Sequence, residues 1–264
     1  MAGPTTAERG ERQQESSGPP PARRSSRPRL RTIVILAVAT VLLASGSVWL
    51  LYGSPWLRAE RVSVSGTGVL TPAQVRSAAA VPVGAPLMSI DADAIEARLR
   101  RKLPRIDSVD VVRSWPHGIG VKVTERTAVL VMRKGGEFVE VDDDGVRFAT
   151  VPQAPKGVPV LELAISRPGT AAAGLRRFGT DGLVREAVRI AADIPPAVAH
   201  TTRTLKVRSY DNISLELSGG RTVLWGSAEN GPAKARTLTA LMKAAPDARH
   251  FDVTVPTAPA SSGS

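Results

Sequence analysis

Apolar residues along this chain form one unbroken block near the N-terminus and then recur in short periodic groups. No Asp, Glu, Lys or Arg occurs in residues 32–57, and the most apolar stretch, residues 32–52, reads TIVILAVATVLLASGSVWLLY. As an α-helix these 21 residues would be about 31 Å long, against a hydrocarbon core of about 30 Å. The block therefore predicts one transmembrane helix at residues 32–52.

The sequence on either side of the block predicts which way the chain crosses the membrane. Residues 1–31 hold seven Arg and three Glu and almost nothing apolar, so we expect a disordered basic tail that stays in the cytoplasm. Trp49, Tyr52 and Trp56 gather at the other end, where aromatic side chains favour the headgroup layer. A cleaved signal peptide is the alternative, but its apolar core is usually only about 7–15 residues long. Everything after the helix is thus expected outside the cytoplasm.

The first region after the block predicts a small domain of order βααββ. Residues 60–66 alternate apolar and polar positions, which is the period of a half-buried strand. Thr71, followed by Pro72 and Gln74, predicts a capped helix start, and Asp91 predicts the start of a second helix. Residues 106–113 and 119–125 then alternate again as a hairpin. Neither helix can bury its apolar face alone, so both should cover one side of a three-stranded sheet.

From Thr127 the pattern becomes mostly β. Turns of Lys-Gly-Gly and Asp-Asp-Asp-Gly separate short alternating runs, which predicts a meander. The expected elements are strands at residues 128–132, 138–141 and 146–149, a helix at 181–192, strands at 205–209, 213–217 and 221–225, a helix at 232–245 and a last strand at 250–255. The predicted fold class is α+β: a single transmembrane helix, the small βααββ domain, and a mixed, mostly antiparallel β-domain with flanking helices.

Composition excludes several kinds of chemistry. The chain has no Cys, which excludes disulfides, thiol catalysis and cysteine metal sites. Its three His are scattered, and residues 226–234 lack the Gly-Lys-Ser/Thr ending of a phosphate loop. The acidic run at residues 142–144 lacks the alternate spacing of a calcium loop and is better explained as a hairpin turn. We therefore expect no enzyme activity, no metal and no cofactor.

The excess of positive charge indicates which kinds of partner the chain could bind. The formal net charge is +11, which suits anionic membrane or wall surfaces. Nucleic acid is the other usual partner of a basic protein. The predicted topology puts most of the excess charge outside the cytoplasm, and only four Phe, four Trp and two Tyr are available to stack on bases. We expect no nucleic-acid partner.

Three segments together resemble the FtsQ/DivIB family of bacterial cell division proteins. They are R-x-W-P-x-x-I-x-V-x-V-x-E-R at residues 113–126, Val-Ser-Val-Ser-Gly with Thr-Pro-Ala-Gln-Val within residues 62–75, and Leu-Trp-Gly-Ser-Ala-Glu-Asn at residues 224–230 before the helix of Lys234. The resemblance implies a POTRA (polypeptide-transport-associated) domain at residues 59–126 and a β-domain at residues 127–256. Residues 257–264 then read as a short flexible tail.

The resemblance also implies a function. The implied function is a non-enzymatic scaffold of the division machinery. Such a scaffold lies in the cell membrane at the septum and holds the FtsB and FtsL proteins there. The family's β-domain binds FtsB by strand addition to its last strand, and by position that strand corresponds to His250, Phe251, Asp252, Val253, Thr254 and Val255. The sequence departs from the family here because only Phe251 is aromatic. Thr127-Ala128 also stands where the family often has Pro.

Arg113, Trp115 and Glu125 allow two interpretations. In the simpler one Trp115-Pro116 shapes the hairpin and Glu125-Arg126 forms exposed ion pairs worth under about 1 kcal/mol each. In the other, these residues are a partner contact of the POTRA domain. The alternative function is another single-POTRA envelope assembly or secretion factor, although such proteins usually repeat the domain. A membrane-anchored wall hydrolase would need an acid, base or nucleophile cluster that we do not find.

Overall fold

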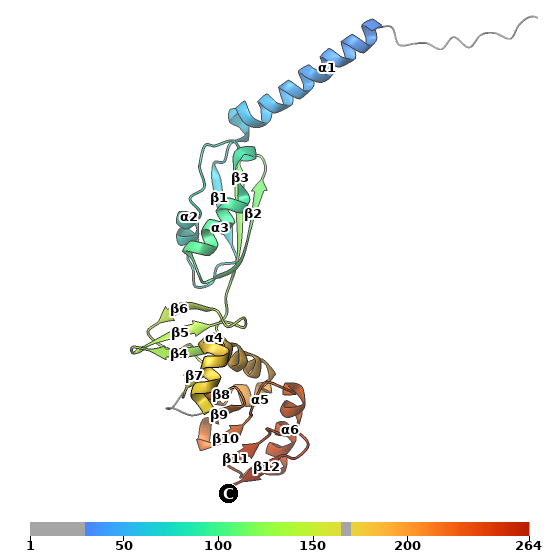
Figure 1. Ribbon diagram of the computed structural model, residues 1–264. Helices are drawn as coiled ribbons and strands as arrows, with labels where there is room; N and C mark the ends of the chain where they lie inside the picture. Colours follow the sequence, from blue (N-terminus) through green and yellow to red (C-terminus); the bar gives the residue numbers. More distant parts are fainter. Residues whose placement is uncertain (1–29, 165–169, 264) are drawn as a thin grey trace, which may run out of the picture. The chain divides into compact units, whose positions relative to one another are not determined.

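The computed structural model describes residues 30–164 and 170–263 (Figure 1). Helix α1 (Leu30–Val48) continues as a π-helical turn at Trp49–Gly53, and the two together are long and apolar enough to cross a membrane. The helix predicted at residues 32–52 is present and starts slightly earlier, at Leu30. The sequence predicts a disordered tail at residues 1–31. Residues 1–29 lie outside the described residues, and residues 30–31 belong to α1.

The chain divides into two compact units, residues 1–50 and 51–264, and the second unit contains two β-sheets. The smaller sheet has the order β1-β3-β2, with β1 parallel and β2 antiparallel to the central β3. Its elements are β1 (Arg61–Ser65), α2 (Pro72–Ala79), α3 (Ala92–Lys102), β2 (Ile106–Ser114) and β3 (Gly118–Glu125), with 3-10 turns at Pro55–Leu57 and Leu87–Ser89. The predicted βααββ order is confirmed.

Both helices beside the smaller sheet begin as their sequences predict. The Thr71 hydroxyl accepts the N–H of Gln74, and the Gln74 side chain accepts the N–H of Thr71, so two otherwise free donors are satisfied. Asp91 accepts the N–H of Ala94 in the same way at the start of α3. The helices cover one face of the sheet (Figure 1). Val75, Ile95 and Leu99 of the helices and Leu87 of the turn before α3 are buried in one core with Ile119 and Val121 of β3.

The larger sheet has nine strands in the order β12-β11-β10-β9-β8-β7-β4-β5-β6. Neighbours are antiparallel except that β7 runs parallel to β4 and β8, and β10 runs parallel to β11. The strands are β4 (Leu130–Lys134), β5 (Glu137–Val141), β6 (Arg147–Val151), β7 (Val160–Leu163), β8 (Thr202–Ser209), β9 (Asn212–Leu217), β10 (Thr222–Leu224), β11 (His250–Asp252) and β12 (Ala260–Ser262). The predicted mixed, mostly antiparallel sheet is confirmed.

Helices flank the larger sheet and share one core with it. They are α4 (Thr170–Asp193), α5 (Pro196–Ala199) and α6 (Gly231–Ala244), with a 3-10 turn at Ser218–Gly220. Leu183, Val184 and Ile190 on one face of α4 are buried, and they share a core with strand and helix side chains that include Leu205, Leu215, Trp225 and Leu238. Burial of this continuous apolar surface holds α4 and α6 against the sheet.

The structure also contains elements that the sequence pattern did not predict. Strand β7 is short and follows Pro159, yet Leu161 is buried between its two neighbouring strands. Helix α4 begins well before Asp181 and breaks at Gly179, whose φ of 66° is readily adopted only by glycine. Helix α5 starts with Pro196 in its first turn, a position that suits proline because no helical N–H bond is needed there. Strand β12 lies in the segment expected to be a flexible tail.

Candidate functional site

Strand β11 lies inside the larger sheet and not at its end. It is parallel to β10, with Phe251 opposite Val223, and antiparallel to β12, with Phe251 opposite Ser261. Both of its backbone edges are therefore paired. The expectation that residues 250–255 form the last strand is wrong, because β11 stops at Asp252 and another strand follows it.

Two of the six side chains expected to contact a partner lie inside the protein. Phe251 and Val253 are 2% and 0% exposed, and the N–H of Val253 donates to the carbonyl of Leu224 at 3.0 Å. Alternate residues of an extended chain share a face, which explains why both enter the core. Among the predicted contact residues, His250 and Val255 are exposed, and Asp252 and Thr254 are half-buried.

A turn fixed by side chains joins β11 to β12. The carboxylate of Asp252 accepts the N–H and the hydroxyl of Thr254, at 2.9 and 2.7 Å. Thr237 of α6 donates its hydroxyl to the carbonyl of Pro256 at 3.2 Å. The structure thus differs from the flexible tail expected at residues 257–264: its prolines and small residues predict flexibility, but these contacts bring residues 260–262 back alongside β11.

Strand β12 ends the sheet, and all of its residues are exposed. The carbonyl of Arg249 accepts the N–H of Thr222, and the N–H of Val253 donates to the carbonyl of Leu224, so alternate residues along β11 direct their backbone groups toward β10. Phe251 lies between these two residues with the same orientation, and the hydrogen-bonded pairs with β12 are therefore His250–Ser262 and Asp252–Ala260. In agreement, the carbonyl of Ser262 faces β11 and accepts the N–H of Arg249 at 3.2 Å. The N–H and C=O of Ser261 consequently point away from β11, toward the open edge.

A shallow hollow of about 380 Å³ lies beside this open edge. Its lining comes from all three terminal strands: Thr222, Leu224, His250, Phe251, Asp252, Ala260, Ser261 and Ser262. Backbone groups at the edge and a recess next to them are the two features that a docking strand and its side chains require.

Arg113 and Trp115, expected as a possible contact of the smaller sheet, have unlike surroundings. The guanidinium of Arg113 donates to the carbonyls of Leu87 and Ile90, at 3.0 and 2.8 Å, so it ties β2 to the segment before α3. Trp115 lies exposed in the turn between β2 and β3. Both residues are exposed, but the Arg113 guanidinium already bonds backbone carbonyls of the domain, whereas the Trp115 side chain is open to a partner.

Glu125 fastens a loop of the smaller sheet. Its carboxylate accepts the N–H groups of Gly68, Val69 and Leu70, at 2.7, 3.0 and 2.9 Å. Burial raises the pKa of Glu125, but these three donors and the nearby Arg105 outweigh burial and lower the pKa below its ordinary value. The interpretation of Glu125 as part of an exposed ion pair is therefore wrong.

Two arginines that border the β2–β3 hairpin bond acidic residues of the larger sheet. Arg105 contacts Glu140 at 2.5 Å, and its guanidinium lies 5.1 Å from the centroid of the Phe148 ring. Arg126 bonds the carboxylate of Asp142. Both carboxylates are buried, so water screens these ion pairs little. Sequence reasoning missed this interdomain clamp, as we name these four charged residues, because no local pattern links partners so far apart in the chain.

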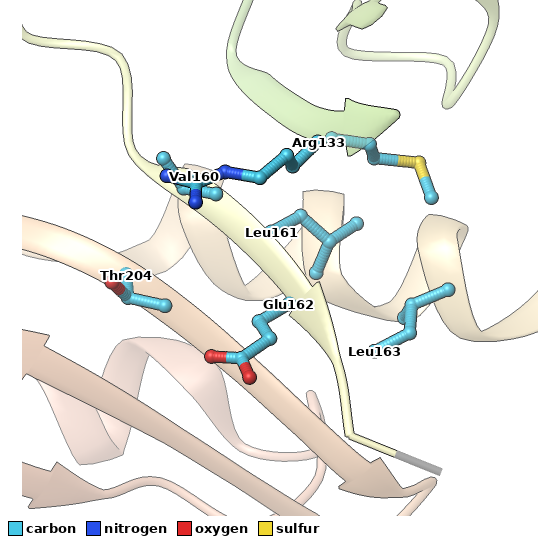
Figure 2. Close-up of a pocket in the computed structure, with 7 residues that line it drawn as sticks. Arg133, Val160, Leu161, Glu162, Leu163 and Thr204 are labelled. Atoms are coloured by element: carbon cyan, nitrogen blue, oxygen red, sulfur yellow. The ribbon is translucent and has the colours of Figure 1, made fainter. Parts of the chain in front are cut away.

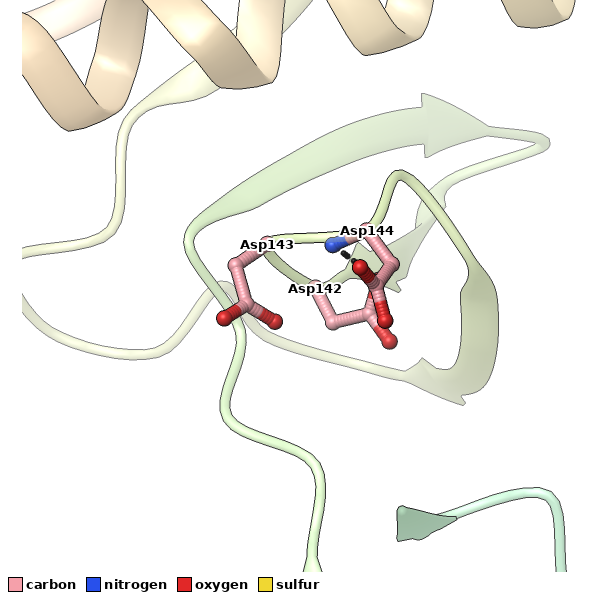
Figure 3. Close-up of side chains that lie close together, drawn as sticks. All are labelled: Asp142, Asp143 and Asp144. Carbon is pink, nitrogen blue, oxygen red and sulfur yellow. Dashed lines mark hydrogen bonds between the residues drawn. The ribbon is translucent and has the colours of Figure 1, made fainter.

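The acidic run forms the turn between β5 and β6, as predicted (Figure 3). One carboxylate oxygen of Asp142 accepts the N–H groups of Asp144 and Val146, at 3.1 and 2.7 Å, and the other accepts the bond from Arg126. The carboxylates of residues 142–144 lie within 4.8 Å of one another, and those of Asp143 and Asp144 are exposed. The buried carboxylate is thus already used by the turn and by the interdomain clamp.

A second hollow, of about 480 Å³, lies where β4 and β7 separate (Figure 2). These strands pair only through Val131 with Val160 and Met132 with Leu161. Apolar side chains, a threonine and the oppositely charged Arg133 and Glu162 line the space. No His, Cys or Ser lines it, so the most common catalytic bases and nucleophiles are missing there.

Buried polar groups support the turn before α6. The ammonium of Lys234 donates to the carbonyl of Ser227 at 2.9 Å, and Glu186 of α4 accepts the N–H of Ala228 at 2.8 Å. Burial lowers the pKa of Lys234, while nearby carboxylates oppose that effect. The charge of Glu186 also raises the pKa of Tyr210. The bonds of Lys234 and Glu186 to backbone groups give this cluster a structural role.

Two family models match most of the chain. The model described as "POTRA domain, FtsQ-type" matches residues 57–126, and the model described as "Cell division protein FtsQ/DivIB, C-terminal" matches residues 129–254.

Curated relatives match over the full length. Proteins named "Cell division protein FtsQ" from Streptomyces collinus and Streptomyces coelicolor are 76% and 75% identical to the chain over 264 residues, with 100% of each chain covered. A protein of the same name from Mycolicibacterium smegmatis is 32% identical over 210 residues, covering 80% of this chain and 57% of its own. Among solved structures, the major extracytoplasmic domain of the trans isomer of the cell division protein DivIB from Geobacillus stearothermophilus matches at 16% identity, covering 46% of this chain and 94% of its own with a TM-score of 0.32.

Proposed function

The chain belongs to the FtsQ/DivIB family of bacterial cell division proteins, and from that premise we propose that it is a membrane-anchored, non-enzymatic scaffold of the division machinery. Its proposed partners are division proteins of the FtsB and FtsL type. One observation supports this proposal above all: the larger sheet ends in β12, whose residues are exposed and whose outer edge has no neighbouring strand in the described part of the chain.

An extended segment of the FtsB-type partner would add beside β12. An edge strand offers unpaired N–H and C=O groups, and an added strand completes the ladder. The small side chains of Ala260, Ser261 and Ser262 leave this backbone accessible, and the hollow over β10–β12 offers room for side chains of the partner. Of the contacts first expected at residues 250–255, the exposed His250 and Val255 are retained as flanking contacts.

A proline at Ser261 tests strand addition. Ser261→Pro removes an N–H that points to the open edge and leaves the His250–Ser262 and Asp252–Ala260 pairs in place. We expect it to weaken the binding of a purified FtsB-type segment to the full chain in detergent by about tenfold, which corresponds to the loss of about one hydrogen bond. Titration calorimetry measures the affinity.

Ser261→Ala is the matched control, because it keeps the N–H and should bind like the parent chain. Unchanged affinity of Ser261→Pro, with circular dichroism showing a folded protein, would rule out strand addition at β12. A proline at Val253 is unsuitable as a test. That N–H bonds Leu224 and the side chain is fully buried, so the sheet itself would be damaged.

We also propose a topology for the scaffold. The apolar segment Leu30–Gly53 is taken as one transmembrane anchor, with the N-terminus in the cytoplasm and both sheets outside. The excess of Arg over Glu in residues 1–31 supports this direction. The POTRA domain is placed at residues 59–126. The β-domain, first expected at residues 127–256, is extended to include β12 because that strand belongs to the larger sheet. A role in division places the protein at the septum.

The side-chain chemistry of the described residues supports a scaffold over an enzyme. The groups with a displaced pKa are Glu125, Lys234 and Tyr210. The first two hydrogen-bond backbone groups that hold a loop or a turn, and the third lies against the carboxylate of Glu186. The bonds of Glu125 and Lys234 to backbone groups thus serve the fold.

A further inference from the structure

The segment between α1 and β1 is bonded to a loop of the POTRA domain. Arg58 forms a β-bridge with Pro86, and its guanidinium donates to the carbonyl of Gly84 at 2.9 Å. The N–H of Ala59 donates to the carbonyl of Ala85, also at 2.9 Å, and Ala59 is fully buried. Residues 58–59 are therefore part of the domain and not a free tether.

The next residues are bonded to the turn between β2 and β3. The N–H groups of Glu60 and Arg61 both donate to the carbonyl of His117, at 2.9 and 3.1 Å. The chain thus enters the POTRA domain between two surface segments, the loop at residues 82–86 and the hairpin tip at residues 114–118. We call this end of the domain the entry face.

Large exposed apolar side chains gather on the entry face. Trp56 in the connecting segment, Val83 in the loop and Trp115 at the hairpin tip are 72%, 68% and 50% exposed. Such a group normally marks a surface that something covers. Val69 is as exposed, but it lies in the loop that Glu125 fastens, and Glu125 is at the end of β3 away from the hairpin tip.

The charges beside these side chains favour a lipid surface as the covering partner. Arg58 and Arg61 are exposed on the entry face, with Glu60 as the single acid between them. Tryptophan rings settle in the headgroup layer, and arginines beside them attract anionic headgroups. Aromatic rings flanked by arginines can therefore bind both the headgroup layer and its negative charge.

Chain length keeps the entry face close to the proposed anchor. Arg58 follows Gly53, the last residue of the apolar segment, by five positions. Even a fully extended chain of that length reaches only about 18 Å. The headgroup layer on each side of the hydrocarbon core adds about 5–8 Å of thickness. A short segment bonded to the domain therefore restricts how far the entry face can lie from the headgroups.

We propose that the entry face of the POTRA domain seats on the anionic lipid headgroups of the membrane that α1 crosses, with Trp56, Val83 and Trp115 in the interfacial layer. The inference rests on the membrane anchor of the proposed function. It gives the hairpin tip a lipid partner and leaves β12 as the protein-binding edge. Lipid contact would fix the tilt of the domain relative to the membrane plane.

Single spin labels test this inference, because the chain has no native Cys. The full chain is reconstituted in vesicles of phosphatidylethanolamine and phosphatidylglycerol with one label at a time: Leu42→Cys in α1, Ser114→Cys at the hairpin tip, or Val69→Cys in the loop fastened by Glu125. Collision with a water-soluble nickel complex and with oxygen reports the depth of each label. We expect several-fold less nickel collision at residue 114 than at residue 69.

A second variant links the depth to the tryptophan. Trp115→Ser in the Ser114→Cys background should raise nickel collision at residue 114 toward the value at residue 69. If residue 42 reads acyl-chain depth while residue 114 is as accessible as residue 69, the lipid contact is wrong and the anchor stands. If residue 42 itself is accessible to nickel, the anchor fails. Shielding of residue 114 that appears only after an FtsB-type partner is added would make the entry face a protein contact and overturn the inference.

Discussion

At the scale of single residues, one carboxylate organises a whole loop of the POTRA domain. Glu125 collects the N–H groups of three consecutive residues between β1 and α2. Gly66 makes the approach possible, because its φ is +82° and a Cβ there would lie 2.0 Å from the carbonyl oxygen of Val123. Gly66 after β1 and Glu125 at the end of β3 thus act together to hold this loop against the sheet.

Glu125→Gln should destabilise the protein in a pH-dependent way. The folded state lowers the pKa of Glu125, so its ionised form stabilises the fold fully above the ordinary pKa of glutamate, about 4.3. That contribution is lost as the pH falls through the lowered value. At pH 7 we expect Glu125→Gln to reduce the free energy of unfolding by about 1–2 kcal/mol, and the difference from the parent chain should vanish in acid.

Urea unfolding of the full chain in detergent, repeated from pH 7 down to pH 3, measures this difference. Glu60→Gln is the control, since Glu60 is an exposed acid of the same domain and should have little effect. A Glu125→Gln deficit that stays constant with pH would show that the loop does not depend on the charge.

At the scale of elements, the sequence predicted the helices and strands that have a clear local pattern. It missed the short strands that form only because neighbouring strands pair with them. Alternation and capping residues predicted the POTRA elements, the meander and α6, and all are present. Strands β7 and β12 were missed because a few residues show no period, and their extended form comes from neighbouring strands. The same limit misplaced the candidate site, since alternation made residues 250–255 a strand but could not show that residues 260–262 cover it.

The link between the POTRA domain and the β-domain depends on the interdomain clamp. Arg105→Ala together with Arg126→Ala would leave the buried carboxylates of Glu140 and Asp142 without cations, which is strongly unfavourable. We expect the two domains to move more freely as a result. Spin labels on Ser77→Cys and Lys156→Cys, one in each domain, should show a broader distance distribution than in the parent chain.

Arg100→Ala is the matched control for this measurement. It removes an ion pair with Glu96 that lies within α3 and does not join the domains. Its distance distribution should equal that of the parent chain. An equally narrow distribution after loss of both clamp arginines would mean that the connecting backbone alone holds the domains together.

At the scale of the whole molecule, the anchor, the POTRA domain and the binding edge have separate tasks along one chain. The proposed role at the septum predicts that a fluorescent protein fused to the N-terminus of the full chain concentrates at division septa. The same fusion to residues 1–57 alone should label the membrane evenly, because it carries the anchor without the folded domains. Even labelling by the full chain, seen by microscopy of dividing cells, would contradict a role in division.

The side chains of β12 have a consequence for how this protein can diverge from its relatives. The strand carries only small uncharged side chains, those of Ala260, Ser261 and Ser262. A docking strand therefore finds little shape or charge to recognise in them. An interface read mainly through the backbone tolerates exchange of its side chains and is vulnerable to proline. Over evolution the partner, more than this strand, would then carry the residues that decide which protein is accepted.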